Sequence, residues 1–157
     1  MPALTPCLWF DNQAEEAARF YTGIFPNSRI NSVSRYTEAG REIHKMPPGS
    51  VMTVEFELDG KTFTGLNGGP VFKFNEAVSF QIMCKDQREV DHYWDNLTAG
   101  GDPTAQQCGW LKDKYGVSWQ VVPVVLQSLV SKSQKATAAM LKMKKIDIAA
   151  LERAASE

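Results

Sequence analysis

The sequence predicts an α+β domain made of two similar halves, and two observations carry this prediction. A strand that ends in a polar cap and leads into an amphipathic helix occurs twice, with the caps 74 residues apart. Each helix is then followed by segments in which apolar and polar residues alternate, as they do in strands. This spacing is too long for a solenoid repeat and is typical of a duplicated βαβββ module.

The first half begins with an apolar run, Leu4–Phe10, which predicts a strand. A capping box follows, with Asn12 at the cap and Glu15 three residues later. Apolar residues then recur at helical spacing until Pro26 ends the helix. Three further strands are predicted, the last two joined by the hairpin signal Asp59-Gly60: Arg29–Tyr36, Val51–Leu58 and Lys61–Leu66.

The second half repeats the order. Val78–Cys84 alternates as a strand, and Asp86 with Glu89 forms a second capping box. The helix that follows has a clean apolar stripe and ends at Gly100-Gly101. Three strands are again predicted: Thr104–Cys108, Gly109–Asp113 and Val117–Pro123.

The organisation predicted is a duplicated domain over residues 1–123, with modules at about 1–72 and 73–123, and a helical tail over 124–157. The tail carries two short apolar stripes and a last helix capped by Asp147. Two interpretations of the tail stay open. It either covers its own domain or docks on a partner subunit.

Composition excludes several classes of function. The formal net charge is −1, with 17 basic and 18 acidic residues, so no strong field attracts nucleic acid or anionic lipid. The sequence shows neither a secretory signal nor an apolar run of membrane-spanning length, which predicts a cytoplasmic protein. The three cysteines, Cys7, Cys84 and Cys108, are widely spaced and predict small buried hydrophobic residues rather than a disulfide framework.

The chain resembles the vicinal oxygen chelate superfamily, the glyoxalase and bleomycin-resistance fold, and within it the PhnB-like (demethylubiquinone-methyltransferase-like) branch. The stretch Trp110–Pro123 is the most specific part of the resemblance. The segments that carry it span nearly the whole chain: Asn12–Ala17 with Phe20-Tyr21, Leu66–Pro70, Cys84–Asp91, Cys108–Pro123 and Lys142–Ile148.

The resemblance implies a curved mixed sheet with helices outside, a concave funnel inside, and a homodimer that completes the funnel. Strand alternation then sorts the side chains. Val54, Phe56, Leu58, Val78, Phe80, Ile82, Val117, Trp119 and Val121 are expected under the helices. Glu55, Ser79, Gln81, Ser118 and Gln120 are expected on the funnel face, and such a polar row indicates a small-molecule pocket.

Superfamily members commonly hold a divalent metal on the inner strands, where it acts as a Lewis acid. The resemblance places the ligand positions at Pro6, Asn67, Ser79 and Gln120. Proline has no donor side chain, and serine and asparagine are weak ligands for zinc, iron or nickel. No glycine-rich loop opens a helix as a nucleotide cradle. The sequence therefore predicts no bound metal and no cofactor.

Three functional hypotheses follow. The first is a ligand-binding dimer whose site uses Trp9, Asn67, Ser79, Gln81, Trp110 and Gln120. The second is an enzyme of lyase, isomerase or oxygenase type in the same funnel, with or without a divalent metal and with Glu55 as candidate general base. The third is a regulatory module whose C-terminal helices bind a partner. None of the three names a substrate.

Overall fold

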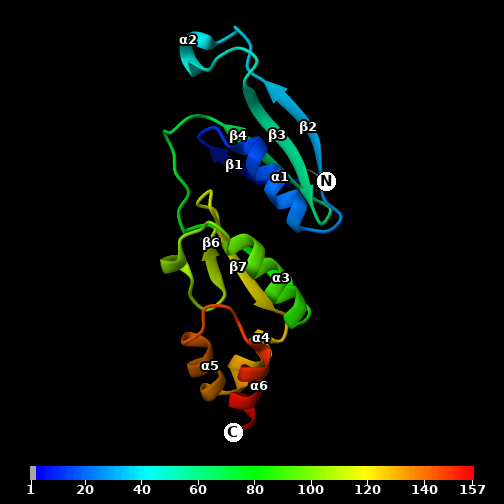
Figure 1. Ribbon diagram of the computed structural model, residues 1–157, viewed down its shortest axis with the longest axis vertical. Coiled ribbons are helices and arrows are strands. Elements are labelled where there is room, and N and C mark those ends of the chain that lie inside the picture. Colours follow the sequence, from blue (N-terminus) through cyan, green and yellow to red (C-terminus); the bar gives the residue numbers. More distant parts are fainter. Residues whose placement is uncertain (1–2) are drawn as a thin grey trace. The chain divides into compact units, whose positions relative to one another are not determined.

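The computed structural model describes residues 3–157 and confirms the α+β class (Figure 1). The chain forms two compact units, Met1–Lys73 and Phe74–Glu157. Each unit contains its own mixed sheet with a helix packed on one face. On the other face of each sheet, most side chains are exposed or half-buried.

The first unit follows the predicted βαβββ order. Its sheet runs β1-β4-β3-β2, with β1 parallel to β4 and the other pairs antiparallel. A single helical turn, α2, lies in the segment between β2 and β3. The elements are β1 (Cys7–Phe10), α1 (Ala14–Ile24), β2 (Arg29–Arg35), α2 (Arg41–His44), β3 (Val51–Leu58) and β4 (Lys61–Asn67).

Helix α1 forms because small and aromatic residues recur along one stripe, from Ala14 to Ile24, and all of that stripe is buried. The stripe packs on β3, where Val54 and Phe56 are fully buried. Asp59 and Gly60 both adopt positive φ, as the predicted two-residue hairpin requires. The first strand is shorter than predicted, because it starts at Cys7 and Leu4 is 99% exposed.

The capping box predicted at Asn12 and Glu15 is wrong. The residue at the cap is Gln13, and its side chain makes no capping hydrogen bond. The first helical N–H, that of Ala14, instead donates to Asn67 Oδ1 at 2.8 Å. The cap of α1 is therefore supplied from the end of β4, 53 residues away in the sequence.

The second unit has a three-stranded sheet in the order β5-β7-β6, with β5 parallel to β7. The strand predicted over Thr104–Cys108 is wrong: the region folds as a 3-10 turn because Asp102 caps it and Pro103 fixes its first φ. The elements are β5 (Phe80–Cys84), α3 (Gln87–Thr98), η1 (Pro103–Ala105), β6 (Trp110–Lys112) and β7 (Ser118–Pro123).

The second predicted cap is confirmed. Asp86 Oδ1 accepts from the Glu89 N–H at 3.0 Å, and the Glu89 carboxylate accepts from the Lys85 N–H at 2.9 Å. The buried stripe of α3 packs on β6 and β7, and it comprises Val90, Tyr93, Trp94 and Leu97. The expected burial of Val78 is wrong, since this residue precedes β5 and is 68% exposed.

Three short helices end the chain, α4 (Leu126–Lys132), α5 (Gln134–Leu141) and α6 (Ile148–Ser156). Asp147 caps α6 through the Ala150 N–H, as predicted. The residues Met143–Ile148, here called the strap, join the last two helices. Strap carbonyls accept hydrogen bonds from the backbone N–H groups of Cys108 and Gly109, each at 2.8 Å.

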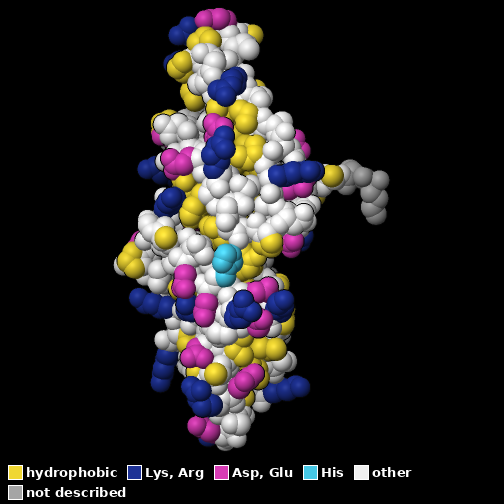
Figure 2. Space-filling view, turned by 45° about the vertical axis from the view of Figure 1, so that its right-hand side comes forward, with side chains coloured by type: hydrophobic (Ala, Val, Ile, Leu, Met, Phe, Trp, Pro, Cys, Tyr) yellow, Lys and Arg dark blue, Asp and Glu magenta, His cyan; other side chains and the backbone are white. Residues whose placement is uncertain are grey.

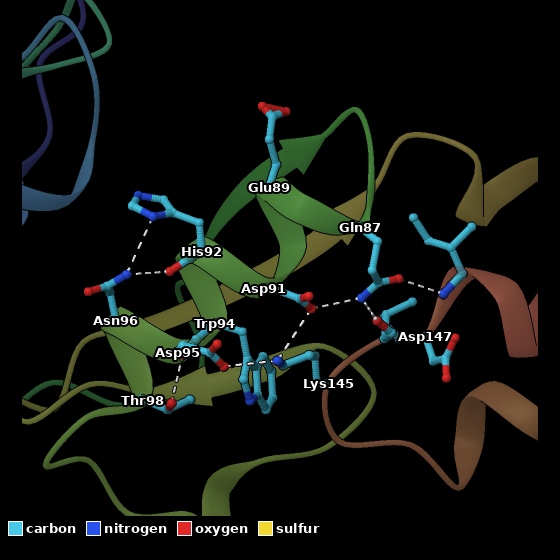
Figure 3. Close-up of polar contacts among 12 residues, drawn as sticks. Gln87, Glu89, Asp91, His92, Trp94, Asp95, Asn96, Thr98, Lys145 and Asp147 are labelled. Atoms are coloured by element: carbon cyan, nitrogen blue, oxygen red, sulfur yellow. Dashed lines mark hydrogen bonds and ion pairs between the residues drawn. The ribbon is translucent and has the colours of Figure 1, made fainter.

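Side chains fix the strap to α3 as well (Figure 3). The Gln87 amide donates to Asp91 and to the Ile146 carbonyl, and its oxygen accepts from the Ile148 N–H. Lys145 pairs with Asp95 at 2.9 Å and with Asp91 at 3.3 Å. Its hydrogen bond to Asp95 is the largest cause that raises the pKa of Lys145; burial opposes it, and the hydrogen bond to Asp91 adds to the rise. The strap therefore binds the tail to its own unit.

Within residues 3–157, no helix is both long and apolar enough to cross a membrane. On the face drawn in Figure 2, acidic and basic side chains are intermingled rather than gathered into single-sign patches. This distribution agrees with the near-zero net charge of the sequence.

Candidate functional site

The uncovered face of the second sheet brings together most of the site residues predicted for that half. Gln81, Gln120 and Trp110 are direct cross-strand neighbours on β5, β7 and β6. Residues opposite one another share a face, so these three side chains form one row. We call this surface the amide face. It comprises Gln81, Met83, Trp110, Lys112, Gln120 and Val122 on the strands, together with Ser79, which precedes β5 and is hydrogen-bonded to Gln120.

Two hydrogen bonds link the polar side chains of the amide face. Gln81 Nε2 donates to Gln120 Oε1 at 3.3 Å, and Gln120 Nε2 donates to Ser79 Oγ at 2.8 Å. Gln81 is exposed, while Ser79 and Gln120 are half-buried. The chain of donors therefore leads from solvent into the partly covered part of the face.

Ser118 departs from the expectation that it lies open on the same face. Its side chain is in the predicted phase, but the residue is 2% exposed and its buried hydroxyl has no hydrogen-bond partner among the described residues. A hydroxyl buried without a partner destabilises a fold.

We expect Ser118→Ala to raise the free energy of unfolding by about 1 kcal/mol, because it removes this uncompensated group. Ser133→Ala is the matched control, since Ser133 Oγ caps α5 through the Ala136 N–H and its loss should cost about 1 kcal/mol. Urea titration of both variants gives the comparison. A loss of stability in Ser118→Ala would contradict the assignment of an unpartnered hydroxyl.

The uncovered face of the first sheet carries Trp9 and Glu55. Phe10 is only 2% exposed and points into the core, so the neighbouring Trp9 faces the opposite side of the sheet. The indole N–H donates to the Gly69 carbonyl at 2.9 Å. The indole packs edge-to-face with the Phe72 ring, with 4.8 Å between the ring centroids. A Cβ on Gly68 would lie 2.2 Å from the indole ring, so only glycine leaves room for it. The loop after β4 therefore fixes the orientation of Trp9.

Glu55 is exposed and accepts a hydrogen bond from Ser32 Oγ at 3.4 Å. It lies opposite Thr64 on the same face. A general base is usually desolvated and oriented by a second group. The surroundings of Glu55 are those of a solvated strand residue, and its catalytic role stays a prediction.

Asn67, at the end of β4, is a packing residue rather than an open ligand. It is 5% exposed. Besides capping α1, its Nδ2 donates to the Val51 carbonyl at 3.2 Å, and its own carbonyl accepts from the Tyr36 hydroxyl. The side chain thus ties α1 and β3 to β4, and the backbone carbonyl of the same residue holds Tyr36, which follows β2.

A cavity of about 580 Å³ opens beside the first turn of α1 in the first unit. Three carboxylates line it, from Asp11, Glu15 and Glu16, and Glu15 is ion-paired with Arg19 at 3.0 Å. Its other walls come from the loop before β3 and the loop after β4. No sequence pattern indicates this cavity, because its walls come from segments about 50 residues apart that are adjacent only in the fold.

Neither the cysteines nor the histidines form a reactive pair. Burial, with smaller contributions from Glu89 and Asp86, raises the pKa of Cys84 to about 12, so the thiol is protonated at neutral pH. Cys7 is exposed, which contradicts its expected burial. His44 is held by the Met46 N–H and the Tyr36 ring, and His92 lies on the side of α3 away from Lys145 (Figure 3).

Comparison with known proteins decides the family. The family model described as 3-demethylubiquinone-9 3-methyltransferase matches residues 2–122 of this chain. A putative 3-demethylubiquinone-9 3-methyltransferase, the PhnB protein of Bacillus cereus, is 35% identical over 78% of this chain and 99% of its own, with a TM-score of 0.65. The chain belongs to this PhnB-like family.

More distant structures share the fold of this PhnB-like protein. A Pseudomonas aeruginosa protein matches at 16% identity and a TM-score of 0.59, over 78% of this chain and 98% of its own. The fosfomycin resistance protein FosX of Listeria monocytogenes, in a structure with Mn(II) and sulfate, matches at 14% identity and a TM-score of 0.51, over 81% and 97%. No curated protein matches the chain.

The most family-specific stretch of the PhnB-like protein builds a turn. Asp113 is 2% exposed, and its Oδ1 accepts from the N–H groups of Tyr115 and Val117 at 2.8 and 3.0 Å. Its Oδ2 accepts from the Trp119 indole at 2.9 Å, and Gly116 takes the positive φ that closes the turn. This part of the family signature therefore holds β6 against β7 and seats Trp119 in the core.

The superfamily's divalent metal does not fit the donor set found here. Gln120 donates to Ser79 and accepts from the neighbouring Gln81 amide, so both residues are already engaged in the hydrogen-bonded row. Asn67 uses both atoms of its amide in buried contacts, and Pro6 offers no side-chain donor. Across residues 3–157, no three His, Cys, Asp or Glu side chains gather as ligands. No chemical step is therefore assigned to a metal in this PhnB-like protein.

Proposed function

We propose that this PhnB-like protein binds a small molecule on the amide face without a protein-held catalytic metal. The observation that carries the proposal is the hydrogen-bonded row from Gln81 through Gln120 to Ser79, beside the half-buried Trp110. Polar groups placed precisely next to an aromatic surface are the usual composition of a ligand site. Two members of the row, Ser79 and Gln120, occupy positions where the resemblance expects metal ligands.

The fold supports the same proposal. Proteins of this architecture carry the helix on one face of the sheet and leave the other face available, as both units do here. FosX, which shares the fold, is described as a fosfomycin resistance protein, so one protein with this fold is named for resistance to a small molecule. We further propose that two copies of the chain associate to enclose the site and that the protein works in the cytoplasm.

The test is a thermal-shift screen of the full-length chain against a chemically diverse library. A ligand at 100 times its Kd should raise the free energy of unfolding by about 2.7 kcal/mol. We expect at least one compound whose shift disappears in Gln120→Met and in Trp110→Ala. Gln134→Met is the matched control, because Gln134 is exposed on α5, and it should respond as the native chain does.

Two results would contradict the proposal. The first is a set of hits that keep their full shift in Gln120→Met and Trp110→Ala, which would move binding elsewhere, for example to the cavity beside α1. The second is stoichiometric zinc, iron, nickel or manganese in elemental analysis of the purified protein that is lost in Gln120→Met. Light scattering of the same samples measures whether the chain is a dimer.

A further inference from the structure

Some hydrogen-bond donors and acceptors of the amide face are not used within the face itself, and the order of donation along the row identifies them. Because each glutamine of the row donates onward, the Gln81 carbonyl and one Gln81 N–H are not used by the row. The Ser79 hydroxyl accepts from Gln120, so its own hydrogen points out of the row. Gln81 is the exposed end. The row therefore presents to solvent an acceptor and a donor on one planar amide.

Charge on this face is balanced. Among the seven residues that define the amide face, all within the described chain, Lys112 is the charged one, and it is ion-paired with Glu76. The hydrogen bond from Lys112 lowers the pKa of Glu76, so this carboxylate stays ionised and keeps the pair intact at neutral pH. An anionic or cationic ligand would find no unpaired countercharge here, which favours a neutral ligand.

Three apolar side chains complete the face. Trp110 stands next to Gln120 in the row, and the next row pairs Met83 with Val122. Met83 is 55% exposed, and Trp110 and Val122 are half-buried. An aromatic ring placed against Trp110 gains stacking energy and covers the exposed thioether. The available surface thus suits a planar apolar body attached to a polar edge.

We infer that the amide face recognises a neutral, planar molecule with a cyclic amide (lactam) edge, which rests on the proposed function of this same site. The ligand N–H donates to the Gln81 carbonyl oxygen, and the ligand carbonyl accepts from the unused Gln81 N–H. The fused or adjacent ring of the ligand lies against Trp110. Recognition depends on Gln81 in particular, whereas Gln120 orients the Gln81 amide.

The probes are three flat bicyclic molecules that differ at one edge: 2-quinolone, N-methyl-2-quinolone and quinoline-2-carboxylate. Each is titrated into the full-length chain while tryptophan fluorescence is followed. We expect 2-quinolone to bind about tenfold or more tightly than the N-methyl compound, because a polar group left unpaired costs at least 1.4 kcal/mol. The carboxylate should bind more weakly than 2-quinolone.

Gln81→Met keeps the length of the side chain and removes both hydrogen-bonding groups. This variant should therefore bind 2-quinolone and its N-methyl analogue about equally tightly. Gln134→Met should leave the preference unchanged. Equal binding of the two quinolones by the native chain, tighter binding of the carboxylate, or a preference that survives Gln81→Met would overturn the inference.

The failure of this inference is distinguishable from that of the proposed function. If neither quinolone binds but another library compound binds in a manner that Gln120→Met abolishes, the ligand class is wrong and the site stands. If no compound of any class depends on Gln120 or Trp110, the proposed function is wrong and the ligand class fails with it.

Discussion

Asp113→Ala should destabilise the protein by about 3–5 kcal/mol, because the change leaves several buried donors without an acceptor. The carboxylate accepts from the Tyr115 and Val117 N–H groups and from the Trp119 indole N–H. Hydrogen bonds to an ionised group contribute about 1.5–3 kcal/mol each. Since the whole stability of a domain is about 5–15 kcal/mol, this one residue carries a large fraction of it.

Urea unfolding followed by tryptophan fluorescence measures this effect, because Trp119 is 2% exposed in the native state. Asp11→Ala is the control, since Asp11 is exposed and should change stability by less than about 0.5 kcal/mol. Asp113→Asn should lie between the two, because an amide keeps one acceptor oxygen but sets its NH₂ group against a second donor.

A double-mutant cycle isolates the indole contact. In a Trp119→Phe background no indole N–H remains to be satisfied, so Asp113→Asn should cost less than it does in the native chain. Equal costs in the two backgrounds would mean that the Asp113–Trp119 hydrogen bond contributes nothing. A loss below about 1 kcal/mol for Asp113→Ala would remove the turn from the set of features that hold this unit together.

Asn67→Ala should cost about 2–4 kcal/mol, because Asn67 caps α1 from a distance and also satisfies the Val51 carbonyl. Loss of a cap alone accounts for about 1 kcal/mol, and the unpaired buried carbonyl and the space left by the side chain add the remainder. Thermal unfolding monitored by circular dichroism at 222 nm records the change.

Asn12→Ala is a decisive control for this prediction. The sequence pattern assigns the cap of α1 to Asn12, and that assignment predicts a loss of about 1 kcal/mol for Asn12→Ala and little for Asn67→Ala. The structure assigns the cap to Asn67, so Asn12→Ala should be nearly silent. A larger effect at Asn12 than at Asn67 would reverse the assignment.

Local patterns predicted the elements whose causes are local. The stripe of α3, its cap at Asp86 and the hairpin turn at Asp59-Gly60 are all decided within a few residues, and all three are as predicted. The errors arose where distant residues supply the missing partner. Asn67 replaced the local cap of α1, and the strap satisfied the Cys108 and Gly109 N–H groups that a strand over Thr104–Cys108 would have used.

The candidate site was predictable in part for the same reason. Alternation within each strand, set on the fold that the resemblance implies, put Gln81 and Gln120 on one face, because side chains on a strand point to opposite sides in turn. Their contact depends on the parallel register of β5 and β7, which no local pattern contains. The burial of Ser118 and the cavity beside α1 depend on segments far away in the sequence, so the pattern of the strands could not reveal them.

The strap lies beyond the end of the family match, so the end of the match and the end of the folded second unit fall at different residues. The family signature ends at residue 122, before the last three helices. A chain shortened to that point would leave the Cys108 and Gly109 N–H groups, the Gln87 amide and the hydrophobic neighbourhood of Ile146 exposed to water. The family match therefore ends near residue 122, whereas the hydrogen bonds that hold the second unit together extend through the strap. Truncated versions intended for expression, and domain limits copied from relatives, should respect the second boundary.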